Sequence, residues 1–226
     1  MWQAQLISHS LSYLVAGSPN EFVRLISINS INLQVQVIGD SHARRIRDQS
    51  GVYFKCRDVD ISFRCKGGAR TPFLKIPFDQ SSFDLIIFVI GSNDLADGKD
   101  ILVLYNELIG YAQNYIDGSF CSRVVIMTLL PRADPWYQER MKQFNAMLTS
   151  NTKDSIVGWY WSKKLKGYLS LTDGVHLIER GYQKAVLYLG SPIFYFYKPS
   201  YKKKRLIWVW SLICLVCIHN KLLCGS

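Results

Sequence analysis

The chain has 226 residues, of which 49% are hydrophobic and 19% charged, a composition that excludes disordered and fibrous proteins. This length suits one well-buried domain with an appendage and is too short for two large domains. The formal net charge of +10 would suggest a polyanionic partner, but no specific nucleic-acid motif occurs and one C-terminal cluster supplies half of the excess: Lys198, Lys202, Lys203, Lys204 and Arg205.

The first predicted strand covers residues 33–38 and ends at a sharp corner. The chain stops at Gly39 and Asp40, presents Ser41, and enters a basic helical segment near Ala43. A hydroxyl at such a corner lies at a helix N-terminus, where unpaired N–H groups and the helix dipole favour a developing oxyanion. The same residues also suit an ordinary turn with a capping serine, so this stretch alone does not identify a nucleophile.

Two further predicted strands also end in small or polar residues. Residues 59–65 are followed by a glycine-rich turn at 66–70, and residues 84–90 by Gly-Ser-Asn-Asp at 91–94. The run at 84–90 is almost continuously apolar, which is typical of a strand covered on both faces in a parallel sheet.

Predicted helices and strands alternate through the rest of the chain, at 100–116 (helix), 124–130 (strand), 137–150 (helix), 156–160 (strand) and 179–189 (helix). This alternation predicts the α/β class, with a doubly wound, mainly parallel five-stranded sheet and helices on both faces. Ligands bind at the carboxyl ends of the strands in such sheets. We therefore expect the residues that follow the first three strands to share one edge.

A nucleophilic serine needs a base, and the chain has four histidines: His9, His42, His176 and His219. The first and last lie outside the segment predicted to fold, and the side chain of His42 should diverge from its neighbour Ser41. His176 follows Asp173 by three residues in a loop before the last helix. That spacing lets the carboxylate bind Nδ1 while Nε2 faces the serine, although a helix cap with a surface histidine has the same pattern.

An oxyanion also needs N–H donors directed at it. The backbone N–H groups of Ser41 and Gly68 and the side-chain amide of Asn93 are the candidates. We prefer Gly68 to Gly67, because a side chain at this position would obstruct the substrate carbonyl. A plain β-turn and a helix cap remain the structural alternatives for the glycine pair and for Asn93.

Taken in order, these segments resemble the SGNH (GDSL-type) hydrolase superfamily over about residues 33–190. The four signature residues of that family match Ser41, Gly68, Asn93 and His176, and its third triad member matches Asp173. The resemblance implies a three-layer α/β/α sandwich of flavodoxin-like fold. It also implies hydrolysis of carboxylic esters, or occasionally acyl transfer, without a metal or organic cofactor.

Four short segments further resemble esterase domains related to LINE-type retroelements in animals: Gly-Asp-Ser-His-Ala-Arg-Arg, Ile-Gly-Ser-Asn-Asp-Leu, Leu-Leu-Pro-Arg and Asp-Gly-Val-His-Leu. The chain departs from the common SGNH pattern at His42, where Leu is usual, and at Ala69-Arg70, where Asp-Thr is frequent. Arg70 and Arg132 each lie just beyond a predicted strand end. There they would bind an anionic group of the substrate or form salt bridges.

The sequence therefore predicts a serine esterase for small acetyl or short acyl esters. One alternative is a catalytically silent SGNH-like domain that binds a partner or an acylated glycan. Another is a flavodoxin-like nucleotide binder whose strand-end glycines hold phosphate, although no Gly-x-Gly-x-x-Gly or Walker pattern occurs.

We expect three regions: an N-terminal extension (1–30), the hydrolase-like domain (31–191) and a C-terminal tail (192–226). The apolar stretch at 206–218 is shorter than the roughly 20 residues that span a bilayer. Residues 202–218 would instead contact a membrane surface, with basic groups on anionic lipid. A core segment or an unpacked extension is the alternative for this stretch.

The six cysteines are irregularly spaced and match neither a disulfide framework nor a four-ligand zinc site. Cys214 and Cys217 lie in an apolar run with only His219 nearby, so we interpret them as core or membrane-type cysteines. The first thirty residues lack the basic segment and apolar core of a secretory signal. These features favour a reducing, intracellular location. Contact of the C-terminal tail with a membrane surface would add peripheral membrane association.

Overall fold

Five parallel strands form a single sheet in the computed structural model, which describes residues 33–53, 59–75, 81–150, 155–161 and 163–197. The strand order is β2-β1-β3-β4-β5, and the strands are β1 (Leu33–Gly39), β2 (Val59–Cys65), β3 (Leu85–Val89), β4 (Val124–Met127) and β5 (Ile156–Trp159). This is the flavodoxin-like order, so the predicted fold class is confirmed.

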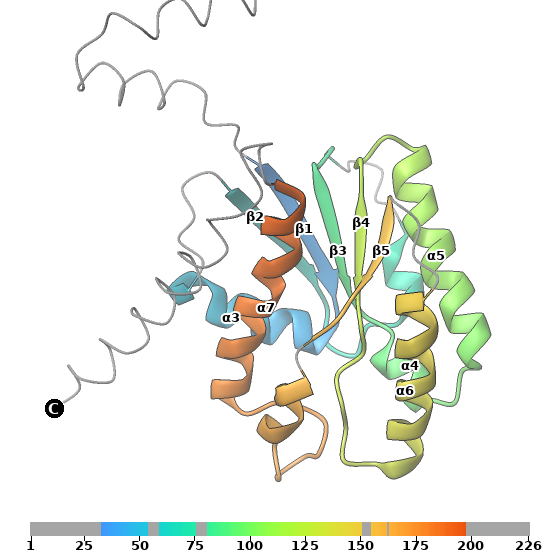
Figure 1. Cartoon of the computed structure of the whole chain (residues 1–226), viewed down its shortest axis with the longest axis vertical. Coiled ribbons are helices and arrows are strands. Elements are labelled where there is room, and N and C mark those ends of the chain that lie inside the picture. Colours follow the sequence, from blue (N-terminus) through green and yellow to red (C-terminus); the bar gives the residue numbers. More distant parts are fainter. Residues whose placement is uncertain (1–32, 54–58, 76–80, 151–154, 162, 198–226) are drawn as a thin grey trace, which may run out of the picture. The chain divides into compact units, whose positions relative to one another are not determined.

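Helices cover both faces of the sheet. They are α3 (Ser41–Tyr53), α4 (Ser92–Ala96), α5 (Ile101–Asp117), α6 (Pro135–Ser150) and α7 (Glu179–Tyr197), with short 3-10 helices η2 (Thr71–Leu74) and η3 (Lys163–Tyr168). Figure 1 shows α3 and α7 together on one side of the sheet and α5 and α6 on the other. The structure is therefore the expected three-layer α/β/α sandwich.

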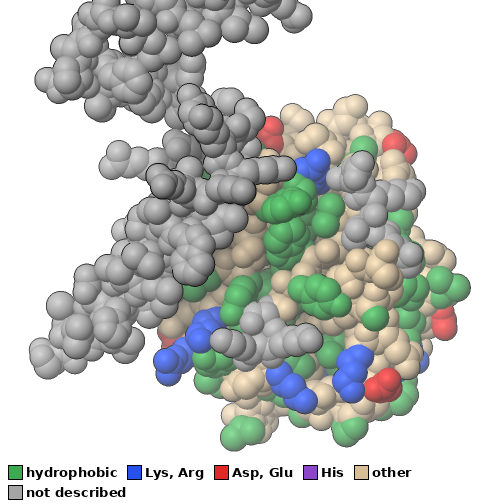
Figure 2. Space-filling view, viewed as in Figure 1, with side chains coloured by type: hydrophobic (Ala, Val, Ile, Leu, Met, Phe, Trp, Pro, Cys, Tyr) green, Lys and Arg blue, Asp and Glu red, His purple; other side chains and the backbone are tan. Residues whose placement is uncertain are grey.

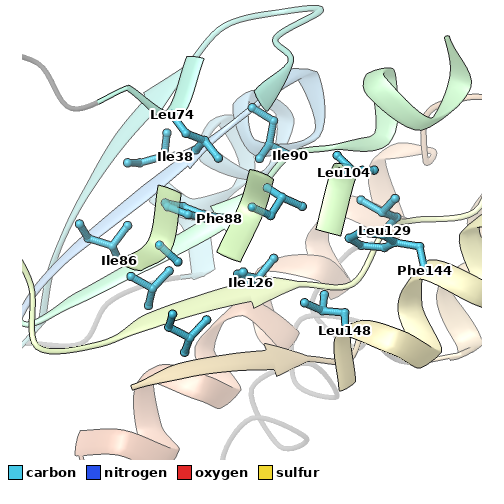
Figure 3. Close-up of a cluster of buried hydrophobic side chains, with 14 of the residues drawn as sticks. Ile38, Leu74, Ile86, Phe88, Ile90, Leu104, Ile126, Leu129, Phe144 and Leu148 are labelled. Carbon is cyan, nitrogen blue, oxygen red and sulfur yellow. The ribbon is translucent and has the colours of Figure 1, made fainter. Parts of the chain in front are cut away.

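Alternation of side chains along the central strands builds a core on each face. Ile86 and Phe88 of β3 are fully buried against α5 and α6, in a cluster that also contains Ile126, Leu104 and Phe144 (Figure 3). Val37 and Ile87 pair in register and point to the opposite face; both are fully buried. Each such side chain stabilises the fold by about 1.5–3 kcal/mol, which explains the near-continuous apolar runs of these strands.

Two elements end elsewhere than the sequence predicts. The strand expected over 124–130 ends at Met127, because the side chain of Asn145 binds both the N–H and the carbonyl of Leu129 (2.7 and 3.1 Å) in place of a neighbouring strand. The last predicted helix, at 179–189, continues to Tyr197 with Pro192 inside it.

The chain divides into two compact units, Met1–Gly190 and Ser191–Ser226. Residue 192, the expected start of the tail, lies inside α7. The expected extension at 1–30, the basic and apolar stretch at 202–218, and Cys214 and Cys217 lie outside the described residues. In the part of the chain that is described, no helix is both long enough and apolar enough to cross a membrane.

The carboxyl end of β1 can turn into α3 only because residue 39 is glycine. The N–H of Asp40 donates to the carbonyl of Val89 at 3.1 Å, which brings the two strand ends together. A Cβ atom at Gly39 would lie 2.2 Å from that carbonyl oxygen and 2.7 Å from the Cβ of Ala43. Glycine therefore sets the path by which the chain presents Ser41.

Candidate active site

Ser41 is the first residue of α3 and directly follows the end of β1. The carboxylate of Asp40 accepts a hydrogen bond from the N–H of His42 at 2.8 Å, and its carbonyl accepts one from the N–H of Arg44 at 3.1 Å. These bonds fix the first turn of the helix and leave the hydroxyl of Ser41 half-buried at the carboxyl edge of the sheet. The predicted corner is therefore present.

His176 and Asp173 meet Ser41 from a loop that precedes α7. Nε2 of His176 lies 2.9 Å from Oγ of Ser41, and Nδ1 lies 2.7 Å from Oδ2 of Asp173. The other oxygen of Asp173 accepts the N–H groups of Val175 and His176 at 2.9 Å each. The structure thus brings together the serine, the histidine and the aspartate that the sequence singles out.

The loop that carries the histidine is held in place by its own backbone. The N–H of Ser170 donates to the carbonyl of His176 at 2.7 Å, and the N–H of Ala133 donates to the carbonyl of Gly174 at 2.6 Å. Gly174 has a φ of 62°, in the left-handed region that favours glycine. The loop is therefore fixed both to itself and to the segment after β4.

Electrostatics keep Asp173 ionised. The N–H groups of His176 and Val175 lower the pKa of Asp173 well below its usual range, with the bond to the imidazole adding to the effect. A carboxylate at this position can fix the orientation of the imidazole and stabilise it when it gains a proton.

Asn93, in the first turn of α4, has its side chain fixed by two partners. Its Nδ2 donates to the carbonyl of Ala69 at 3.0 Å, and its Oδ1 accepts from Nη2 of Arg132 at 2.8 Å. Arg132 also donates from Nε to Oγ of Ser92 at 3.1 Å. An amide nitrogen carries two hydrogens, and the described residues give the second one of Asn93 no partner.

The two arginines that follow strand ends therefore have different surroundings. Arg70 forms an exposed salt bridge with Asp97, one of the two roles considered for it. Arg132 instead binds the neutral side chains of Asn93 and Ser92 and stacks over the ring of Tyr137 at 5.0 Å. Its position orients Asn93, a role that the sequence did not suggest.

The glycine turn after β2 lies next to the end of β1, because the N–H of Lys66 donates to the carbonyl of Gly39 at 3.1 Å. Within the turn, the N–H of Ala69 is already bound to the carbonyl of Lys66 at 3.1 Å. Gly68 is exposed and has a φ of 69°, whereas the Cα of Gly67 faces the guanidinium of Arg44. Gly68 is thus the more open of the two glycines.

Asp94 links this turn to α4. Its buried carboxylate accepts from the N–H and the hydroxyl of Thr71, at 3.1 and 3.0 Å, and forms a salt bridge with Lys99 at 2.7 Å. Lys99 also binds Glu107 of α5 at 2.8 Å. The residues that follow β2 and β3 are therefore held together as one unit.

The imidazole of His42 is not hydrogen-bonded to the hydroxyl of Ser41 in the described structure. Its Nδ1 instead shares a hydrogen bond of 2.9 Å with the hydroxyl of Tyr182, in the first turns of α7, and both side chains are buried. Burial lowers the pKa of His42 to about 3, so the ring is neutral. Sequence reasoning missed Tyr182; the available signal was a tyrosine on the apolar face of a helix, where its hydroxyl needs a partner.

Within the described residues, no group of three or more His, Cys, Asp or Glu side chains is arranged to hold a metal ion. The two described cysteines, Cys65 and Cys121, are free thiols.

Neither a protein-family model nor a curated relative matches the sequence. Solved structures do resemble it. They include a proposed platelet activating factor from Streptococcus pneumonia (19% identity, TM-score 0.57, 84% of this chain and 99% of that one). A lipolytic protein of the G-D-S-L family from Veillonella parvula is 16% identical, with a TM-score of 0.54 over 72% of this chain and 98% of its own.

A third similar structure is the C-terminal catalytic domain of peptidoglycan O-acetyltransferase A from Streptococcus pneumoniae. It is 15% identical, with a TM-score of 0.54 over 71% of this chain and 92% of that domain. These similarities show that the chain has the fold of the SGNH (GDSL-type) lipolytic enzymes.

Proposed function

We propose that this chain is a serine esterase that hydrolyses carboxylic esters with acetyl or short acyl groups. The observation that carries the proposal is the unbroken line of hydrogen bonds from Asp173 through His176 to Ser41, at 2.7 and 2.9 Å. A nucleophile whose base is itself oriented by a carboxylate is the arrangement of Ser-His-Asp hydrolases. The similarity to an O-acetyltransferase domain supports a small acyl group.

In the first half of the proposed reaction, Oγ of Ser41 attacks the acyl carbon while Nε2 of His176 takes the hydroxyl proton. The carbonyl oxygen becomes an oxyanion, to which the N–H groups of Ser41 and Gly68 and the amide of Asn93 donate. Cleavage of the ester bond then releases the alcohol, which receives the proton from His176. The product is an acyl-serine.

In the second half, a water molecule attacks the acyl-serine and gives a proton to Nε2 of His176. The second intermediate breaks to release the carboxylic acid, and Ser41 recovers its proton from the imidazolium. Asp173 stays ionised throughout and holds the Nδ1–H of the ring, so that Nε2 always faces the serine.

The direct test is replacement of Ser41 by alanine. Ser41→Ala should lower the turnover of 4-nitrophenyl acetate by about 10³-fold or more, because the nucleophile is removed. Ser50→Ala is the matched control: Ser50 lies on the same helix, and among the described residues its hydroxyl binds only the carbonyl of Arg47, at 2.7 Å. Wild-type activity in Ser41→Ala would refute the assignment.

A fluorophosphonate probe distinguishes the esterase from a catalytically silent binding domain of the same fold. Only a serine activated by a base reacts with such a probe, so wild type should be labelled and Ser41→Ala should not. A wild-type chain that binds acylated glycans but resists labelling would support the silent domain instead.

A further inference from the structure

The nucleophile and its base come from segments 135 residues apart, and the two segments meet at a second point. His42, next to Ser41, shares a hydrogen bond of 2.9 Å with the hydroxyl of Tyr182. Although burial raises the pKa of Tyr182 overall, the backbone N–H of Leu177, next to His176, is close enough to the same hydroxyl to favour its ionised form. The tyrosine hydroxyl therefore hydrogen bonds to the neighbour of the nucleophile and lies beside the neighbour of the base.

The ring of His42 also packs against the base itself. The ring centroids of His42 and His176 are 5.3 Å apart, and the rings are inclined at 52°. His42 is 3% exposed and Tyr182 is 2% exposed, so neither has room to turn away. The ring of His42 therefore packs against the imidazole of His176, and the hydrogen bond from Tyr182 holds that ring in place.

The two nitrogen atoms of the His42 ring have different surroundings. Its Nε2 is buried without a hydrogen-bond partner among the described residues. The ring lines a small cavity of about 10 Å³, which is about the space that one water molecule needs. An apolar side chain of similar size would avoid an unpaired polar atom. Among the described residues, Nδ1 is therefore the ring atom through which His42 forms a side-chain hydrogen bond, with Tyr182.

We propose that Tyr182 and His42 are positioning residues: the tyrosine hydroxyl holds the ring of His42 against His176 and so keeps Nε2 of the base within reach of Ser41. This inference rests on the proposed esterase function. Neither side chain belongs to the line of hydrogen bonds that joins Asp173, His176 and Ser41.

Two physical consequences follow from this arrangement. Small displacements of a reacting group lower the rate of the chemical step strongly, so losing the tyrosine hydroxyl acts on kcat and leaves KM unchanged. The neutral state of His42 matters as well, because a positive ring at this distance would oppose the charge that His176 gains during the reaction.

The test compares two buried tyrosines that each lose one hydroxyl. Tyr182→Phe should lower kcat for 4-nitrophenyl acetate about tenfold or more, with KM unchanged. Tyr115→Phe is the matched control, because Tyr115 is fully buried on α5 and its hydroxyl binds only Arg64 at 3.0 Å in the described residues. Both variants should have a lower melting temperature, but only Tyr182→Phe should lose kcat.

Variants at His42 separate the hydrogen bond from the packing. His42→Asn keeps a polar group near the position of Nδ1 and should retain most of the wild-type kcat. His42→Leu keeps the volume without the polar atom and should lose as much kcat as Tyr182→Phe. Combining His42→Leu with Tyr182→Phe should cause no further loss, since both remove the same bond.

The outcomes decide between the two proposals. An active wild type whose kcat is unchanged by Tyr182→Phe would overturn the positioning role and leave the esterase intact. Equal losses of kcat in Tyr182→Phe and Tyr115→Phe would also overturn it, because the effect would then be one of stability. A wild type that neither hydrolyses esters nor reacts with the fluorophosphonate probe would overturn both proposals.

Discussion

Two hydrogen bonds fix the amide of Asn93 and set the direction of its remaining N–H. Ala69 accepts from the nitrogen, and Arg132 donates to the oxygen. A donor fixed in this way needs no reorganisation when an oxyanion forms, which is where such groups have their effect on rate. Arg132 therefore acts on the proposed reaction through Asn93.

Arg132→Leu should lower kcat for the neutral ester 4-nitrophenyl acetate about tenfold, because Oδ1 of Asn93 loses its donor. Arg70→Leu serves as the control, since Arg70 also follows a strand end but its guanidinium binds, within the described part of the chain, only the exposed Asp97. Steady-state kinetics well below the melting temperature measure both. A loss confined to anionic esters would assign Arg132 to substrate binding instead.

Burial of His42 also predicts a dependence of stability on pH. The pKa of His42 is about 3 in the folded protein, against 6.5 for an ordinary histidine. Between these values the folded state binds fewer protons than the unfolded chain, so stability falls as the pH is lowered through this window. His42→Leu should remove roughly 3 kcal/mol of that loss between pH 6.5 and pH 4, measured by urea unfolding.

Asp40 acts in the opposite direction. Burial raises the pKa of Asp40 from 3.8 to about 6, although the N–H of His42 opposes the change. Between pH 4 and pH 6 the folded state therefore binds more protons at Asp40, and stability falls as the pH rises. Asp40→Asn should make stability rise more steeply with pH over this range in the same unfolding experiment. An unchanged slope would contradict the raised pKa.

At the scale of elements, the turn from β1 into α3 tolerates no side chain at its first position. Gly39→Ala should destabilise the protein by about 3 kcal/mol or more, because the new methyl group would meet the carbonyl of Val89 at 2.2 Å. Gly110→Ala, in the middle of α5, has nothing within 4 Å and should stabilise it by up to about 1 kcal/mol. Thermal unfolding of both variants checks the pair, and similar effects would contradict the steric argument.

The elements and the central residues of the site follow from local sequence signals. Apolar periodicity located the strands and helices, and the strand-end sequences located Ser41 and Asn93, because parallel strands gather their carboxyl ends at one edge. The end of β4 was not predictable, since it depends on the side chain of Asn145 from α6. The roles of Arg132 and Tyr182 likewise depend on partners that are 39 and 140 residues away.

For the whole molecule, the described site residues all lie between Asp40 and Tyr182. The strands end toward the lower side of the view in Figure 1, and several Lys and Arg side chains lie along the same side in Figure 2. Because the described site residues all precede Tyr197, a chain that ends at Tyr197 should turn over 4-nitrophenyl acetate at the rate of the full chain. A lower kcat in the shortened chain, with an unchanged melting temperature, would show that residues 198–226 contribute to the site.

We propose that residues 202–218 contact membrane surfaces, because four basic residues precede a short apolar stretch that contains two tryptophans. Vesicles that contain anionic lipid should carry the full chain upward in a density gradient, and the chain that ends at Tyr197 should stay behind. Neutral vesicles are the control, since the basic residues have no counterpart there. Equal flotation of the two chains would contradict the proposal.

For the proposed esterase, the separation of Ser41 from His176 along the chain has a consequence during synthesis. The ribosome releases the N-terminal part first, so the serine and its oxyanion donors are made long before the histidine that follows by 135 residues. Tyr182 emerges later still. In the proposed esterase, a nascent chain that lacks His176 therefore holds a serine without its base, and hydrolysis requires that His176 and α7 have been translated and folded.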